Sequence, residues 1–152
     1  MMRHLVCLFI VTAASVGGGC SRAGLEGVVP VTGTVTYNGK PVEGAAVSFS
    51  PAGEGRSASA LTTEDGKFSL TTLEAEDGAF PGSYKVGISK SEVVNPISDA
   101  ERQKQFHENM GRMPLEEHRS LLPEKFRNPN TSGLTAEVEK SGENNFAFDL
   151  AD

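Results

Sequence analysis

Tryptophan is absent from the 152-residue chain, and cysteine is almost absent. The two cysteines are Cys7 and Cys20, so the chain after residue 20 has none. This excludes a disulfide framework for the main part of the chain, and it excludes zinc sites built on cysteine pairs. Tyrosine and histidine are also scarce, with two and three residues, whereas Gly 17 and Pro 8 indicate many turns. The composition therefore favours short strands over long helices.

Basic residues are also few, with 14 Lys and Arg against 20 Asp and Glu. Arg3 is the one Lys or Arg before Cys20; subtracting it from 14 leaves 13 basic against 20 acidic side chains. Such an acidic surface argues against nucleic acid, which requires a basic footprint. It is not attracted to anionic lipid headgroups either. Any attachment to a membrane must then come from a hydrophobic anchor.

The N-terminus has the pattern of an export signal. A short basic start containing Arg3 precedes the apolar run of residues 5–16, which is shorter than the about 20 residues that span a bilayer. Gly17-Gly18-Gly19-Cys20 follows and resembles the lipobox of bacterial lipoproteins, in which the cysteine thiol carries a diacylglycerol. We predict a signal peptide over 1–19, lipidation at Cys20 and a tether over 20–30. An ordinary signal peptide cut nearby and a buried core helix are the alternatives.

From residue 31 the hydrophobic pattern has a period of two residues, which predicts β-strands. Asn38-Gly39 and Asp65-Gly66 are hairpin-turn sequences, and Asn144-Asn145 indicates a third turn. We predict an all-β domain over 31–152, with seven strands in a sandwich. The predicted core, taken from one face of each strand, is Val35, Val47, Phe49, Phe68, Leu70, Tyr84, Val86, Ile88, Phe146 and Phe148.

An insertion at about 91–121, before the last two strands, breaks this alternation. Ser98 with Glu101 has the spacing of a helix capping box, and residues 99–109 favour a helix that Gly111 could end. A second short helix is predicted to start at Pro114. The insertion has few apolar side chains, so we expect it to lie loosely on the sheets and to contact a partner. The alternative is a tolerated insertion that has no role.

Candidate catalytic and metal-binding residues are sparse. His107 and His118 both fall in the insertion, without the close spacing typical of zinc ligands. Glu74, Glu76 and Asp77 share one loop, but no calcium-loop pattern is present. No serine lies in a nucleophile elbow. The sequence predicts no enzyme, no catalytic or metal residue and no cofactor; a hydrolase or metal site at the insertion histidines is the lowest alternative.

Three stretches together resemble carboxypeptidase regulatory-like domains: residues 31–45, the central hairpin 62–68, and Pro81-Gly82-Ser83-Tyr84-Lys85-Val86. The resemblance implies a transthyretin-like (prealbumin-like) sandwich. Residues 122–135 and 144–150, combined with the leader, resemble small lipoproteins abundant in planctomycete bacteria. This resemblance implies a place in the cell envelope more than an activity.

We therefore predict an exported, non-enzymatic lipoprotein of the cell envelope that binds or scaffolds, anchored in a membrane whose identity stays open. Its partners would be an envelope protein or a glycan, and no nucleic acid. The alternative is a carbohydrate-binding accessory domain. Such a domain needs exposed aromatic rings for stacking, for which Phe80, Phe106 and Phe126 are the candidates.

Overall fold

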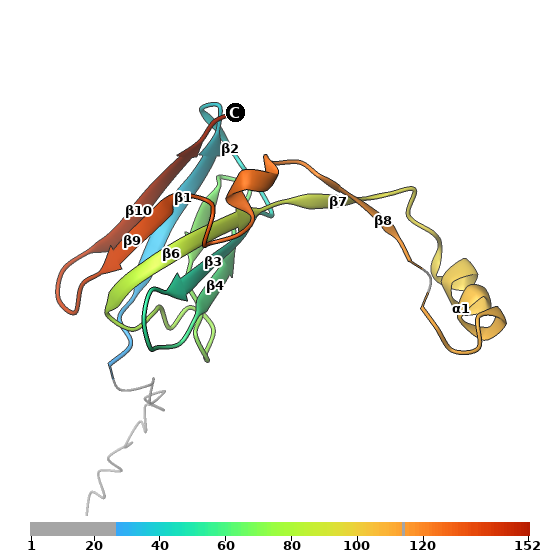
Figure 1. Ribbon diagram of the computed structural model, residues 1–152, viewed down its shortest axis with the longest axis horizontal. Helices are drawn as coiled ribbons and strands as arrows, with labels where there is room; N and C mark the ends of the chain where they lie inside the picture. The colour runs from blue at the N-terminus through green and yellow to red at the C-terminus, as the bar shows by residue number, and fades with distance from the viewer. Residues whose placement is uncertain (1–26, 114) are drawn as a thin grey trace, which may run out of the picture.

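The computed structural model describes residues 27–113 and 115–152. The main body of the molecule is built on two four-stranded sheets that pack face to face, and an arm projects from one side of them (Figure 1). The predicted signal peptide, Cys20 and most of the predicted tether lie outside the described residues. Among the residues described, no helix is both long and apolar enough to cross a membrane.

The first sheet is built around β1 (Val31–Tyr37), which pairs with β10 (Asn144–Leu150) in parallel. On its other side, β1 pairs antiparallel with β2 (Lys40–Pro41) and β5 (Lys67–Ser69). The second sheet has the strand order β4, β3, β6, β9, all antiparallel. Its strands are β3 (Ala46–Pro51), β4 (Ala58–Leu61), β6 (Gly82–Ser89) and β9 (Leu134–Val138).

The core between the sheets confirms the period-two prediction. Nine of the ten predicted core residues are buried, and Phe146 is partly buried against the same cluster. Phe49 lies at the centre, with its ring 5.7 Å from that of Tyr84 on its own sheet and 6.1 Å from that of Phe148 on the opposite sheet. These rings join both layers into one hydrophobic core.

Residues 27–113 and 115–152 form ten strands, so the predicted count of seven is not confirmed. Each of the seven predicted strands has a counterpart; the additional ones are β2, which is only two residues long, and two strands of the arm. Asn144 was expected in a turn but begins β10, where it is buried. Its side-chain amide bonds both the N–H and the C=O of Glu139, which holds the turn before the strand.

The two predicted Asn-Gly and Asp-Gly turns differ in outcome. Asn38 and Gly39 have φ of 50° and 74° and form the tight β1–β2 hairpin, as expected. The Asp65-Gly66 turn forms, with the N–H of Gly66 bonded to the C=O of Thr63 at 2.8 Å. β4 and β5 stay antiparallel neighbours on either side of this turn, with a bridge between Ser59 and Thr71, although β4 pairs mainly with β3 and β5 with β1. The hairpin turn thus also carries the chain from one sheet to the other.

The insertion forms an arm made of β7 (Ser91–Val94), α1 (Asp99–Glu108) and β8 (Glu117–Ser120). β7 and β8 pair as an antiparallel ribbon that leads away from the sandwich, and α1 lies at the far end (Figure 1). The expectation that this segment lies on the sheets is therefore wrong. The backbone groups of β7 and β8 are hydrogen-bonded to each other, and α1 has no buried residue. Neither backbone hydrogen bonding nor apolar burial therefore favours packing of the arm on the sandwich.

The helix predictions within the arm are partly right. Ser98 caps α1, because its hydroxyl oxygen accepts from the N–H of Glu101 at 3.2 Å. The predicted second helix is wrong over the described residues, since the chain runs into β8 from Glu117 onward; Pro114 itself lies outside them. β8 is extended because it pairs residue by residue with β7, and this tertiary pairing overrides a weak local helix preference.

Beyond the arm, a short segment returns across β6 to the second sheet. The 3-10 helix η1 (Glu124–Phe126) buries Phe126, and Leu122 is buried beside it. Gly87 in β6 permits this approach, because a Cβ there would lie 2.8 Å from the backbone oxygen of Arg127 and from Pro129. The sandwich is thus covered by η1 at the place where the arm leaves it.

Candidate functional site

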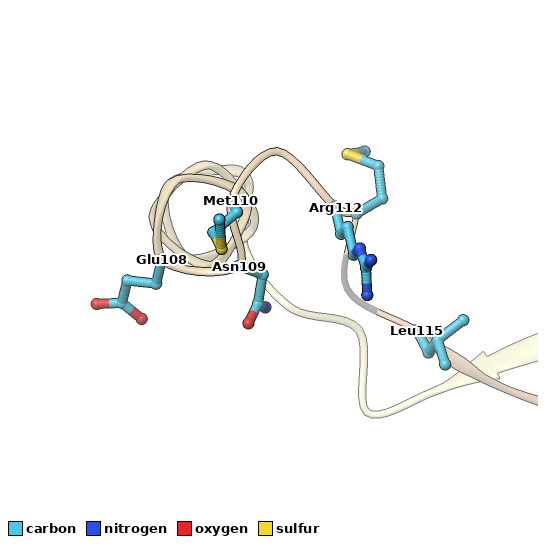
Figure 2. A pocket seen from close by; sticks show the side chains of 6 residues that line it. Glu108, Asn109, Met110, Arg112 and Leu115 are labelled. Carbon is cyan, nitrogen blue, oxygen red and sulfur yellow. The ribbon is translucent and has the colours of Figure 1, made fainter.

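The tip of the arm is the part of the described chain with the most exposed apolar surface. Met110 is 94% exposed, Leu115 is fully exposed, and Met113 and Phe106 are exposed as well. Around the end of α1, Met110, Met113 and Leu115 border an open hollow of about 660 Å³, together with Glu108, Asn109 and Arg112 (Figure 2). Exposed methionines and a leucine close together are typical of surfaces that adapt to a partner.

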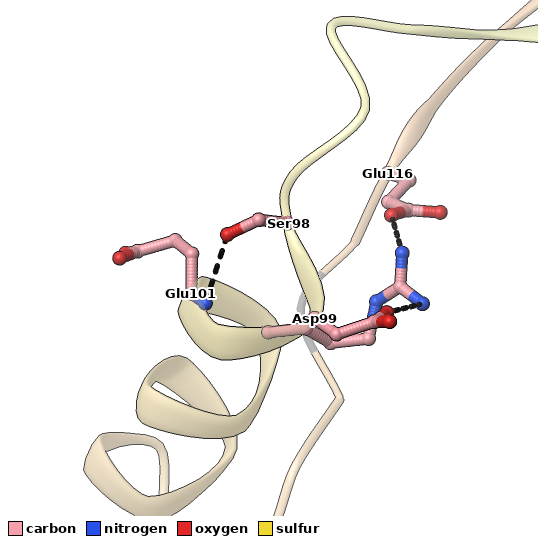
Figure 3. Close-up of polar contacts among 5 residues, drawn as sticks. Ser98, Asp99, Glu101 and Glu116 are labelled. Carbon is pink, nitrogen blue, oxygen red and sulfur yellow. Dashed lines mark hydrogen bonds and ion pairs between the residues drawn. The ribbon is translucent and has the colours of Figure 1, made fainter.

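Polar contacts hold the tip in shape without a core. The guanidinium of Arg102 pairs with the carboxylate of Glu116 at 2.6 Å, across the two sides of the arm (Figure 3). Its other nitrogen lies 3.6 Å from Asp99, and Gln105 donates to Glu101 at 3.0 Å along the helix. The arm is therefore stabilised by surface ion pairs and a helix cap, each of which contributes little. An element held this way can reshape when it binds.

The two insertion histidines are not brought into a metal site. His107 lies on α1 and His118 lies on β8, opposite Val93. Within residues 27–113 and 115–152, no group of three or more histidine, cysteine or acidic side chains is placed to hold a metal ion. The structure therefore gives no support to a hydrolase or metal site at these histidines.

The acidic loop after β5 is organised by one of its own carboxylates. Asp77 accepts from the N–H groups of Thr72, Leu73 and Glu74 at 2.6, 3.0 and 3.0 Å. Burial raises the pKa of the Asp77 carboxyl, but the bonds from these N–H groups outweigh it and hold the pKa below its ordinary value. The loop carboxylate thus closes a turn, which is a structural role.

Asp77→Ala should therefore lower the free energy of unfolding by about 1–3 kcal/mol at pH 7, because three backbone donors lose an ionised acceptor. A carboxyl with a lowered native pKa stabilises the fold above its unfolded pKa, near 3.9, and this contribution disappears as the pH falls through the native value. Denaturant unfolding of both proteins at several pH values measures the difference. A gap that did not shrink below about pH 4 would contradict this role.

The aromatic candidates for sugar stacking do not form a platform. Phe126 was expected to be exposed, but η1 buries it against the core. Phe80 is half-buried and its backbone oxygen accepts from the hydroxyl of Tyr84 at 2.9 Å. Phe106 is exposed at the arm tip, away from both. The three rings lie in separate places, so they do not combine into one stacking surface.

The sequence predicts the insertion as a separate segment, but it predicts neither the ribbon of β7 and β8 nor the cleft next to the sandwich. Where the arm leaves the sandwich, a polar cleft is lined by Lys90, His118 and Arg127, which are far apart in the sequence. No local motif joins these residues, so no sequence pattern could have indicated the cleft.

Comparison with known proteins adds little to this description. No family model matches the chain, and no curated protein matches it. Among solved structures, a 9R-lipoxygenase from Cyanothece PCC8801 is similar over 84% of this chain and 17% of that chain. The TM-score is 0.38 and the sequence identity is 11%, so the chain spans a small part of the lipoxygenase and the likeness supports no conclusion about fold or activity.

Proposed function

We propose that the protein is an exported lipoprotein of the cell envelope, anchored through Cys20, whose transthyretin-like sandwich carries a partner-binding arm. The anchor is supported by the apolar leader that ends in Gly18-Gly19-Cys20. The transthyretin-like assignment is supported by the resemblance of residues 31–45 and 62–68 to carboxypeptidase regulatory-like domains. A binding role, not catalysis, is the proposed activity.

The observation that carries the binding role is the exposed arm tip. The arm tip presents Met110, Met113 and Leu115 to solvent and leaves their apolar area unburied. This exposure costs free energy unless a partner covers the area. The side chains flanking these residues are of both charge signs, as at the rim of a protein interface. The partner that this tip fits best is a protein of the envelope.

A photo-crosslinking amino acid placed at Leu115 tests this role in intact cells. We expect a discrete protein adduct, because the side chain is fully exposed at the tip. The matched control is the same amino acid at Leu73, which is 56% exposed in a loop of the sandwich, and it should give no such adduct. Equal adducts from both positions, or none from Leu115, would contradict the arm as the binding element.

Excision of the arm supplies the second half of the test. Ser91 and Ser120 are directly opposite in the ribbon, so a short Gly-Ser link can replace residues 92–119. The sandwich core contains none of the excised residues, so the thermal unfolding midpoint should stay within a few degrees of that of the intact protein. The adduct partner should no longer be retained by the excised variant.

A further inference from the structure

A polar cleft of about 320 Å³ opens at the base of the arm. It lies among the end of β6, the ends of β7 and β8 nearest the sandwich, and η1. The N–H of Leu121 donates to the C=O of Lys90 at 2.8 Å, which closes the ribbon at this point. The cleft is thus built where four segments meet.

Positive charge collects in this cleft, although the chain as a whole is acidic. Lys90, His118 and Arg127 come from three different segments and line the same space. The one carboxylate in the lining is Glu124, whose Oε2 lies 3.4 Å from a guanidinium nitrogen of Arg127. In the part of the chain that the structure describes, neither Lys90 nor His118 forms an ion pair. Lys90 and Arg127 against the one carboxylate of Glu124 leave the lining with a net positive charge within a negative molecule.

Hydroxyl donors complete the lining. Ser91 and Ser120 are directly opposite in the β7–β8 register, so their side chains share one face of the ribbon, and His118 shares it two residues earlier. Ser120 donates to the C=O of Leu122 at 2.8 Å. Ser89 and Ser91 add two more hydroxyls to the lining of the cleft. An ammonium, a guanidinium and hydroxyls are together the donors that bind oxyanions.

We infer that this cleft binds an oxyanion, namely the carboxylate, sulfate or phosphate group of a small molecule or of a chain end. The volume is near the lower limit for ligand pockets and fits a group about as large as one sugar unit. When the cleft is empty, the Glu124 carboxylate forms an ion pair with Arg127. An incoming anion has to displace this carboxylate, which weakens its binding. This site is separate from the arm tip and does not depend on the lipid at Cys20.

Titration of the full chain, isotope-labelled and kept in neutral detergent, tests the site by NMR. Sodium sulfate, sodium phosphate and sodium glucuronate are added in turn, with sodium chloride at matched ionic strength as the reference. We expect saturable shifts of the amide signals of Ser91, Ser120 and Arg127 with at least one of the three anions. The tightest of them identifies the source of the oxyanion: a sugar carboxylate for glucuronate, a sulfate or a phosphate ester for the others.

Single substitutions then separate a built site from general charge attraction. Lys90→Gln and Arg127→Gln should each weaken binding about fivefold to tenfold, because each removes a charged donor at a solvent-accessible site. Glu124→Gln should strengthen binding severalfold, since it releases Arg127. Lys140→Gln removes an exposed cation from the loop between β9 and β10 and should leave the affinity unchanged.

The inference is overturned by either of two results. One is a set of shifts that grow without saturation for all three anions. The other is a loss of affinity in Lys140→Gln as large as that in Lys90→Gln. Because Glu124→Gln predicts a gain, the test does not depend on variants that merely lose function. An intact amide spectrum outside the cleft confirms that each variant is folded.

Discussion

Phe49→Ala is expected to lower the free energy of unfolding by about 3–5 kcal/mol. The side chain is fully buried, and its ring lies within 6.3 Å of four other aromatic rings. Three of these rings, of Phe68, Phe146 and Phe148, belong to the opposite sheet, so the cavity would open in the middle of the contact between the layers. Its cost adds to the lost transfer free energy, because packed neighbours relax only in part.

Chemical denaturation monitored by far-UV circular dichroism measures this effect. Leu61→Ala is the matched control, since Leu61 is 70% exposed at the sheet edge and its truncation should change stability by no more than about 0.5 kcal/mol. Similar losses in the two variants would mean that Phe49 does not join the two sheets.

Gly33→Ala is expected to lower the free energy of unfolding by about 1–3 kcal/mol or more. A Cβ at this position would lie 2.2 Å from the backbone oxygen of Phe146 and 2.5 Å from the ring of Phe68. The neighbouring oxygen belongs to β10, which pairs with β1 in register, so it cannot move without disturbing the sheet. A glycine inside a strand is typical of such a close approach of two backbones.

Thermal unfolding of Gly33→Ala measures that cost. Gly53→Ala is its control, because a Cβ at Gly53 meets nothing within 4 Å and the backbone there has no positive φ. A midpoint for Gly33→Ala equal to that for Gly53→Ala would contradict the close packing of β1 between its neighbours.

The sandwich strands were predictable because one face of each is buried. Val35, Phe49 and Val86 each lie in an alternating pattern that burial between two sheets imposes on the sequence. The crossing at Asp65-Gly66 was not predictable, since the same turn residues serve a hairpin and a change of sheet. Only the pairing partners of the flanking strands distinguish the two, and these are far away in the sequence.

Most features of the arm could not be predicted from the sequence. The spacing of Ser98 and Glu101 indicated the start of α1, because helix capping is a local interaction. The strands of the ribbon, Ser91–Val94 and Glu117–Ser120, have no alternation, since neither face of the ribbon packs on the sandwich core. The burial of Phe126 could not be predicted from the sequence either, because it results from the packing of η1 on β6 next to Gly87. Tertiary contacts without a local pattern decide all of these features.

The partition of the Cys20→Ala variant between membrane and soluble fractions tests most directly whether this chain is a lipid-anchored module. We expect the unaltered protein to sediment with membranes and Cys20→Ala to become soluble, because buried acyl chains supply the membrane affinity. Cys7→Ala is the matched control; Cys7 lies within the apolar leader, so this variant should sediment like the unaltered protein. A Cys20→Ala protein that stayed fully with the membranes would contradict a lipid anchor at Cys20.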